Sequence, residues 1–402
     1  MAEQLKNPMR NGRSLFMNSR EKEKQIGIPG IAAIMLASSL TVMVGNAITP
    51  ALPELGEVYG LGNYASWLVT APALGVVATS VLFGKLIDKK GPYYAAFLGL
   101  LFYGALGTAG AFTPDATVLF IDRFFLGAAT AAIMSASVAL ISVFFDGEKQ
   151  LRIIAIQGMS MELGGVIFLS ISGVLAGISW QYPFYIYALG FVALIMMILF
   201  IPKCGRADEN VEASADAAMQ QGVPVSLVLL IAFFGMLMFF TAMVSLPIYL
   251  QKELGYSPVF TGNYLAVLDL IAVLAAGMMP KIVASIQEKG CLIVAFLCYG
   301  AAFLIYFISG NSVALCIAVV FAGAGFGLST PLFNSLVVRK SRPEKKGTNI
   351  SLCTMAMFSG QFLSALLVSV LPGKSLFAAA VIIAWMAGIC IIPVTGFYSR
   401  HA

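Results

Sequence analysis

Apolar runs of about 20 residues recur along the whole chain, and they decide what it can fold into. A run of that length crosses the roughly 30 Å hydrocarbon core of a bilayer as an α-helix. Because that core holds no water for the backbone, only helices and closed barrels can span it. No stretch of the sequence alternates apolar and polar residues for long enough to form a barrel. The chain is therefore predicted to be an all-α polytopic protein with the lipid bilayer as its solvent.

Twelve runs fit this description. Of the 402 residues 59% are hydrophobic, against roughly half in water-soluble domains, and the mean hydropathy is +0.91. The first run exceeds a secretory signal core and more spans follow it, so we interpret it as a retained helix. The predicted helices cover 28–50, 64–86, 92–112, 116–145, 153–178, 183–201, 225–250, 260–282, 291–308, 312–338, 350–371 and 376–397.

The basic residues predict the orientation. If both termini are cytoplasmic, 21 of the 24 lysines and arginines fall on the cytoplasmic side, while Lys252 and Lys374 fall on the other and Arg123 lies inside a helix. This asymmetry follows the positive-inside rule and predicts a multi-pass protein of the cell membrane. Because these cations are spread over seven loops and tails, we expect no nucleic-acid partner.

Six cysteines lie in or beside the predicted helices without CxxC spacing, and the one histidine is His401. This pattern predicts no disulfide framework, no metal site and no histidine-based catalytic site or proton relay in the membrane. No Walker-type phosphate-binding sequence occurs either, so we do not expect this chain to hydrolyse ATP. We therefore expect a protein that is not an enzyme and carries no cofactor.

A polar stretch after the sixth run predicts two halves. The expected domains are a basic tail (1–27), a six-helix bundle (28–202), a linker (203–224), a second bundle (225–397) and a short tail (398–402). At an offset of 196 residues, Glu148-Lys149 matches Glu344-Lys345, Met161 matches Met357, and Gly164 matches Gly360. A duplicated pair of pseudo-symmetric bundles is typical of secondary transporters, which bind substrate between the halves.

Several motifs resemble the major facilitator superfamily, and in particular its 12-helix drug and metabolite:proton antiporters. Gly84, Leu86, Asp88, Lys89 and Gly91 are similar to the G-x-L-x-D-[RK]-x-G loop between helices two and three. "RFFLGAATAA" resembles the R-x-x-x-G signature of helix four, and "SWQYPFYI" the entry to helix six. The G-P-x-x-G-G motif of proton-coupled exporters should fall on "FLSISG", which keeps only its last glycine, so an importer remains an alternative.

The resemblance implies a role for the loop residues Gly84, Asp88, Lys89 and Gly91 as a cytoplasmic gate. Asp88 is then expected to face the start of helix eleven, around residues 348–350, and to hold the halves together when the site faces outward. The alternative for the lysines is that they only enforce topology.

Three carboxylates fall well within predicted helices: Asp122, Glu162 and Asp269. A charge at the bilayer centre costs on the order of 2.5–3.5 kcal/mol, so each is a functional candidate. Glu162 and Asp269 both lie about 14 Å from a helix start, near the midplane. The resemblance makes their helices, five and eight, neighbours across the seam, and two acids in a low-dielectric site tend to share a proton.

We therefore hypothesise that Glu162 and Asp269 exchange protons during transport. The alternative is that each is a satisfied polar group. Asp122 and Arg123 lie about 9 Å in from the outer side and, as adjacent helical residues, need not pair. Arg123 could balance a carboxylate, bind an anion or serve the proton step that the family motif implies, and charge balance is the first choice.

Polar side chains in other helices are candidates for hydrogen bonds to a substrate, although each could equally face a neighbouring helix. Nineteen methionines suit either an adaptable cavity or ordinary packing. The polar candidates are Asn46, Ser135, Thr241, Ser245, Asn334 and Gln361, together with Thr41.

These features predict a secondary transporter that works by alternating access, as a monomer, on a small molecule. The leading expectation is proton-coupled efflux of an amphipathic drug or secreted metabolite such as a siderophore, as in multidrug resistance. The alternatives are a proton-coupled nutrient importer, and from another class a membrane sensor or an embedded enzyme. Against a sensor, the short loops leave no signalling domain. Against an enzyme, the sequence places no base near a nucleophile in the membrane.

Overall fold

The computed structural model describes residues 26–145, 147–204, 225–340, 346–371 and 373–399. Helices make up nearly all of this part, and it contains no strand. The first half comprises α2 (Ile28–Asn46), α3 (Leu52–Val58), α4 (Ser66–Lys90), α5 (Pro92–Ala109), α6 (Ala116–Phe144), α7 (Gly147–Ala176) and α8 (Leu189–Phe200). The second comprises α9 (Val225–Ile248), α10 (Pro258–Ile308), α11 (Ser312–Lys340), α12 (Lys346–Val370) and α13 (Lys374–Ser399).

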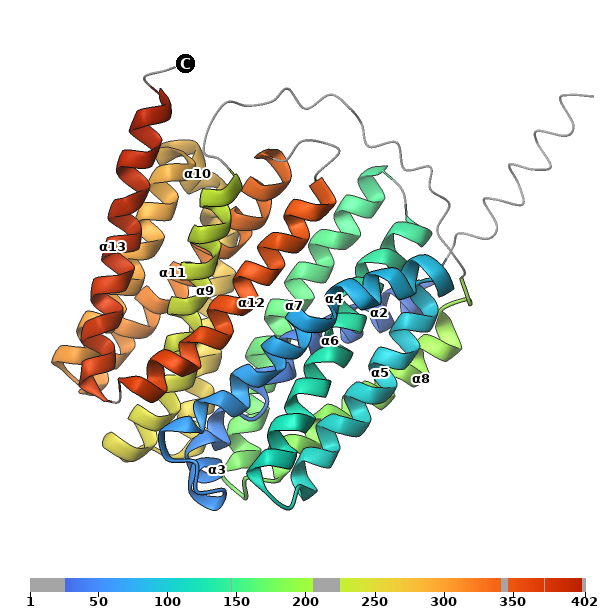
Figure 1. The fold of residues 1–402 in the computed structure, drawn as a ribbon, viewed down its shortest axis with the longest axis horizontal. Coiled ribbons are helices and arrows are strands. Elements are labelled where there is room, and N and C mark those ends of the chain that lie inside the picture. The colour runs from blue at the N-terminus through green and yellow to red at the C-terminus, as the bar shows by residue number, and fades with distance from the viewer. Residues whose placement is uncertain (1–25, 146, 205–224, 341–345, 372, 400–402) are drawn as a thin grey trace, which may run out of the picture.

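Ten helices of the described part are long and apolar enough to cross a membrane. One of them, α10, has 51 residues and changes direction at Gln287, where φ is 62° and ψ is 171°, so it contains two crossings. The apolar part of α13, Lys374–Ile389, supplies a shorter one. The predicted fold of twelve spanning helices in two six-helix bundles is confirmed, and Figure 1 shows the bundles side by side.

The helix ends follow local chemistry. Pro92 and Pro258 occupy first helical positions, where a missing backbone N–H costs no hydrogen bond. Asp115 accepts a hydrogen bond from Val118 N at 3.0 Å and caps α6, and Ser257 caps α10 through Phe260 N at 3.2 Å. Prolines at the first helical position and capping side chains therefore mark where these long apolar helices begin.

Three predicted spans are less regular than the apolar runs suggest. The first ends at Asn46 and continues through a 3₁₀ turn, Thr49–Ala51, into α3. The sixth begins as a 3₁₀ segment, Tyr182–Ala188, and the seventh ends in a π-helical turn, Tyr249–Glu253. These irregular segments all lie at the end of the bundle that carries α3, the lower end in Figure 1, which we call the α3 end.

The opposite end, the upper one in Figure 1, carries the α4–α5 turn, the end of α8 and the break in α10; we call it the basic end. Of the described basic residues outside α6, only Lys252 and Lys374 lie at the α3 end, as the charge pattern predicted. Many large apolar side chains on the outer faces are exposed, including Leu82, Phe125 and Leu199, which suits a surface that contacts lipid. Contacts between the halves run along two seams, α7 with α10 and α4 with α12.

Glycines let helices of one half approach closely. A methyl group on Gly127 of α6 would collide with the backbone carbonyl of Pro72 in α4, and one on Gly75 of α4 would collide with that of Phe124. Small residues at such crossings are typical of membrane helix packing, where dispersion contacts replace the hydrophobic effect.

We predict that Gly127→Ala lowers thermal stability, because the carbonyl of Pro72 belongs to a rigid helix and cannot move aside. Overpacking of this kind costs about 1–3 kcal/mol. The matched control is Gly277→Ala in α10, where no described atom lies within 4 Å of the added methyl group. The measurement is the melting temperature of the purified proteins; equal values for the two variants would contradict this packing.

Candidate functional site

The seam between α7 and α10 holds two carboxylates at mid-depth. Asp269 of α10 is 3% exposed, and Glu162 of α7 is half-buried. The Oδ2 atom of Asp269 lies against Gly165, three residues along α7 from Glu162. The expectation that helices five and eight are neighbours matches the contacts of α7 with α10, whereas proton exchange between the two acids stays a prediction.

Asp269 lies directly against the backbone of α7. A methyl group on Gly165 would sit 2.6 Å from the Oδ2 atom of Asp269, so a larger residue there would require this carboxylate to shift. The Oδ1 atom is buried and has no hydrogen-bond partner among the described residues. Within that part of the chain neither Asp269 nor Glu162 forms an ion pair with a lysine or arginine. A buried carboxyl group without partners is unfavourable, which makes it a functional candidate.

The other intramembrane charges neutralise each other. Arg123 is fully buried, and its Nη2 and Nε atoms donate to Oδ2 of Asp122 at 2.6 and 3.0 Å. The guanidinium also lies over the rings of Phe184 at 5.0 Å and Tyr187 at 5.1 Å. The sequence left open whether these adjacent residues pair, and the structure shows that they do. Arg123 is thus paired with Asp122, while its buried Nη1 atom has no hydrogen-bond partner among the described residues.

Around this ion pair, tyrosine hydroxyls tie the first half together. Tyr103 donates to the carbonyl of Leu40 at 2.6 Å, and Tyr187 donates to that of Val44 at 2.8 Å, so both hold α2. The rings of the two tyrosines pack edge to face, with centroids 5.5 Å apart. The setting of Arg123 is therefore that of a structural core rather than of an open binding site.

We predict that breaking the Asp122–Arg123 pair is worse than removing it. Arg123→Gln leaves a buried carboxylate and Asp122→Asn leaves a buried guanidinium, and each should lower the free energy of unfolding by about 3–5 kcal/mol. The double variant Asp122→Asn/Arg123→Gln should lose less than either single variant. Thermal unfolding of the four purified proteins measures this, and additive losses would show that the pairing carries no energy.

The halves close tightly at the α3 end of the same seam. A methyl group on Gly262 would lie 2.6 Å from both the Cα atom of Gly173 and the carbonyl oxygen of Leu169, so the backbones of α7 and α10 are in close contact there. Gly173 is the one residue of "FLSISG" that the exporter motif shares. At the basic end of α7, Gly158 lies on the same helix face as Gly165, yet no described atom comes within 4 Å of an added methyl group. Along this face, α7 is therefore in close contact with α10 at Gly173 and has open space beside Gly158.

Polar contacts between the halves support this closure. Lys252 Nζ lies 3.0 Å from Glu57 Oε1, and Gln251 donates to the carbonyl of Pro50 at 2.8 Å. On the α4–α12 seam, Ser66 Oγ donates to the carbonyl of Ala365 at 3.4 Å. Sequence reasoning missed this set because its members lie about 200 or more residues apart and carry no local motif.

The Glu57–Lys252 pair yields a second prediction. Glu57→Lys should shift the protein toward conformers separated at the α3 end, and the exchange variant Glu57→Lys/Lys252→Glu should reverse the shift. Both side chains are more than 40% exposed, so we expect a change in population of only about twofold to fivefold. Distances between spin labels on α3 and on residues 249–253 measure it. If the single and exchange variants have the same distance distribution, the pair does not contribute to closure.

The polar candidates are distributed unevenly. Ser135 is half-buried and Asn334 is exposed, whereas Thr41 and the other four are buried. The Thr241 hydroxyl donates to the carbonyl of Leu237, one turn earlier in its own helix, at 2.6 Å. A residue that we did not predict, Gln157 of α7, is 5% exposed and donates to Ser38 Oγ of α2 at 2.8 Å. An amide within an apolar run was the signal available for it. The buried four are Asn46, Thr241, Ser245 and Gln361.

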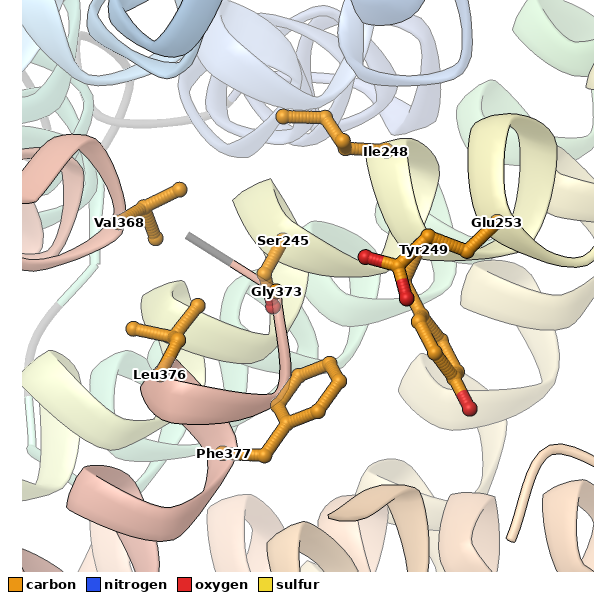
Figure 2. Close-up of a pocket in the computed structure, with 8 residues that line it drawn as sticks. All are labelled: Ser245, Ile248, Tyr249, Glu253, Val368, Gly373, Leu376 and Phe377. Atoms are coloured by element: carbon orange, nitrogen blue, oxygen red, sulfur yellow. The ribbon is translucent and has the colours of Figure 1, made fainter. Parts of the chain in front are cut away.

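Ser245 lines a small cavity at the α3 end of the second half (Figure 2). Its hydroxyl is buried without a hydrogen-bond partner in the described structure, and Tyr249, Glu253 and Phe377 surround the same space. The cavity measures about 40 Å³, enough for a few water molecules and far below the several hundred cubic ångströms of a drug-sized site. In this conformer the cavity is therefore too small to hold a drug-sized molecule.

The gate residues lie at the basic end. Asp88 is exposed near the end of α4, and Gly91 ends that helix with φ of 85°. Helix α4 packs against α12, as the resemblance implied. The side chains of Thr348 and Ile350 lie outside the described residues, so the expected contact of Asp88 with the start of α12 stays a prediction.

The sequence pattern of the Major Facilitator Superfamily matches residues 34–365. The chain belongs to this superfamily. The predicted family is thus confirmed, and proteins that match the chain include ones named as transporters. The match covers both halves and all the intramembrane acids.

The individual relatives have low sequence identity to this chain and match only part of it. A puromycin resistance protein of Streptomyces alboniger is 26% identical over 45% of this chain and 37% of its own length. A riboflavin transporter of Clostridioides difficile (strain 630) is 24% identical over 44% of this chain and 40% of its own. The matched region thus spans less than half of either relative. The crystal structure of a peptide transporter, POT, in complex with sulfate has a TM-score of 0.75 over 96% of this chain and 98% of its own, at 14% identity, which is a likeness of fold.

Proposed function

We propose that this superfamily member is a proton-coupled exporter of amphipathic small molecules, in which Glu162 and Asp269 carry the proton. The observation that carries the proposal is the placement of these two acids on opposite halves, within the seam of α7 and α10, with the Oδ1 atom of Asp269 unpartnered among the described residues. A carboxyl group at the seam changes its surroundings when one half moves against the other, so its affinity for a proton changes with that movement. Protonation of one acid also removes the repulsion between the two.

In alternating access, the α3 end would open when the basic end closes, and the reverse. In the conformer described here the α3 end is closed through Gly173, Gly262 and the Glu57–Lys252 pair. If the positive-inside rule holds, the open basic end faces the cytoplasm and both termini lie there. Closure of the basic end would bring α10 toward Gly158 and Asp88 toward α12, and would have to break the contacts at the α3 end.

The Asp122–Arg123 pair strengthens the assignment by elimination. Arg123 forms an ion pair with Asp122. Its positive charge is therefore neutralised within the first half and does not balance the charge of Glu162 or Asp269. The proton is then the simplest counter-charge for Glu162 and Asp269, and no cofactor is required. Asn46, Ser135, Thr241, Ser245, Asn334 and Gln361 remain candidates for substrate contacts, and we propose that the monomer is the working unit.

Import of a small nutrient is the second candidate. Two observations favour it: "FLSISG" departs from the exporter motif at all positions but Gly173, and one relative is a riboflavin transporter. Export is favoured by the wider resemblance to drug and metabolite antiporters and by a relative named for puromycin resistance. The direction of proton movement distinguishes the two.

The test uses inverted membrane vesicles acidified by respiration, with puromycin, ethidium and riboflavin added in turn while a fluorescent dye reports internal pH. An exporter that exchanges protons for substrate should release protons from the vesicle when its substrate is added. A proton symporter should change the signal in the opposite direction. No response to a compound whose accumulation in cells the protein does change would contradict proton coupling.

We predict that Glu162→Gln and Asp269→Asn each reduce the proton signal at least tenfold, because an amide cannot carry the proton at that site. The matched control is Glu54→Gln, which removes an exposed carboxylate of α3 at the surface. The control should transport at the wild-type rate. Wild-type coupling in both seam variants would rule out the assigned proton carriers while leaving the superfamily membership intact.

A further inference from the structure

A groove of about 480 Å³ lies at the basic end of the first half, away from the seams. It is formed where the α4–α5 turn meets the end of α8, and both α5 and α8 pack chiefly within their own half. A site at this place would face the surrounding membrane rather than the space between the halves. The transport mechanism proposed above does not use it.

The mouth of the groove carries two cations and an aromatic ring. Lys90 and Lys203 both line it and both are exposed, and Lys90 Nζ lies 4.7 Å from the centre of the Tyr94 ring. Neither lysine forms an ion pair with a carboxylate within the described ranges. Two lysines about a hundred residues apart in sequence thus converge on one opening with no counter-charge from the described chain.

The wall of the groove is apolar and continues onto the surface expected to contact lipid. Phe97 and Ile198 line it, and beside them Leu199 and Phe200 of α8 are 67% and 42% exposed. Tyr93 forms part of the groove and is buried. Aromatic rings with one polar edge are typical of the membrane–water boundary, where headgroups meet acyl chains. The groove therefore combines a cationic mouth with an apolar path toward the hydrocarbon.

We propose that this groove binds the phosphate headgroup of an anionic membrane phospholipid, with Lys90 and Lys203 on the headgroup and the acyl chains along Phe97 and Ile198. A basic pocket between spanning helices is suited to an anionic lipid, because each lysine near the headgroup adds attraction. A zwitterionic lipid offers the same phosphate but no net charge to balance two lysines. Free phosphate would match the lysines but would gain nothing from the apolar wall.

The test is native mass spectrometry of the full-length protein in detergent, titrated with dioleoyl phosphatidylglycerol or dioleoyl phosphatidylcholine. We expect the first phosphatidylglycerol to bind more tightly than phosphatidylcholine. In Lys90→Gln/Lys203→Gln its dissociation constant should rise by about tenfold or more. The matched control is Lys149→Gln/Lys281→Gln, which removes the same charge from exposed positions outside the groove and should leave binding within about twofold of wild type.

Three results would overturn the proposal. The first is equal binding of the two lipids by the wild type, and the second is an equal loss in the groove and control variants, which would show a general effect of charge. The third is displacement of phosphatidylglycerol by millimolar inorganic phosphate, which would assign the site to a soluble anion. Because all four lysines are exposed, melting temperatures should stay at the wild-type value, and transport activity plays no part in the readout.

Discussion

The absence of water inside the bilayer governs everything else in this molecule. It requires every spanning backbone to be helical, and it makes each polar or charged side chain inside a helix costly unless it has a partner. The chain meets the second demand in two ways. In the first half, Asp122 and Arg123 form an ion pair and the guanidinium stacks on Phe184 and Tyr187, although its Nη1 atom has no hydrogen-bond partner among the described residues. At the seam, Asp269 lies against Gly165 of α7, and its Oδ1 atom has no hydrogen-bond partner among the described residues.

The Asp122–Arg123 pair thus has a structural setting, whereas the seam acids have the setting that we propose for proton coupling. A salt bridge sealed among aromatic rings within one half holds its geometry whatever the other half does. A carboxylate placed where the halves meet changes its surroundings whenever they move. The glycines of α7 express the same logic, because Gly173 is in tight contact with α10 while Gly158, farther along the same helix, is free. Helix α7 is therefore closely packed against α10 at its α3 end and has open space beside Gly158 at its basic end.

Much of this could be predicted from the sequence. Apolar run length and the side preference of lysine and arginine give the number of helices and their direction, since both depend on local composition. The burial of Glu162 and Asp269 follows from the cost of charge in lipid. Other features depend on tertiary contacts: the bonding of Arg123 to its own neighbour is set by rings of another segment, and Glu57 meets Lys252 only because the halves dock. The groove of Lys90 and Lys203 likewise requires knowing that α5 and α8 are adjacent.

The central claim is that the two seam acids exchange protons with the substrate's movement. It is tested most directly by proton release from purified protein in unbuffered detergent solution when a transported compound is added. The account predicts release from the wild-type protein and none from Glu162→Gln/Asp269→Asn, although the compound still binds. Undiminished release from that double variant would contradict it.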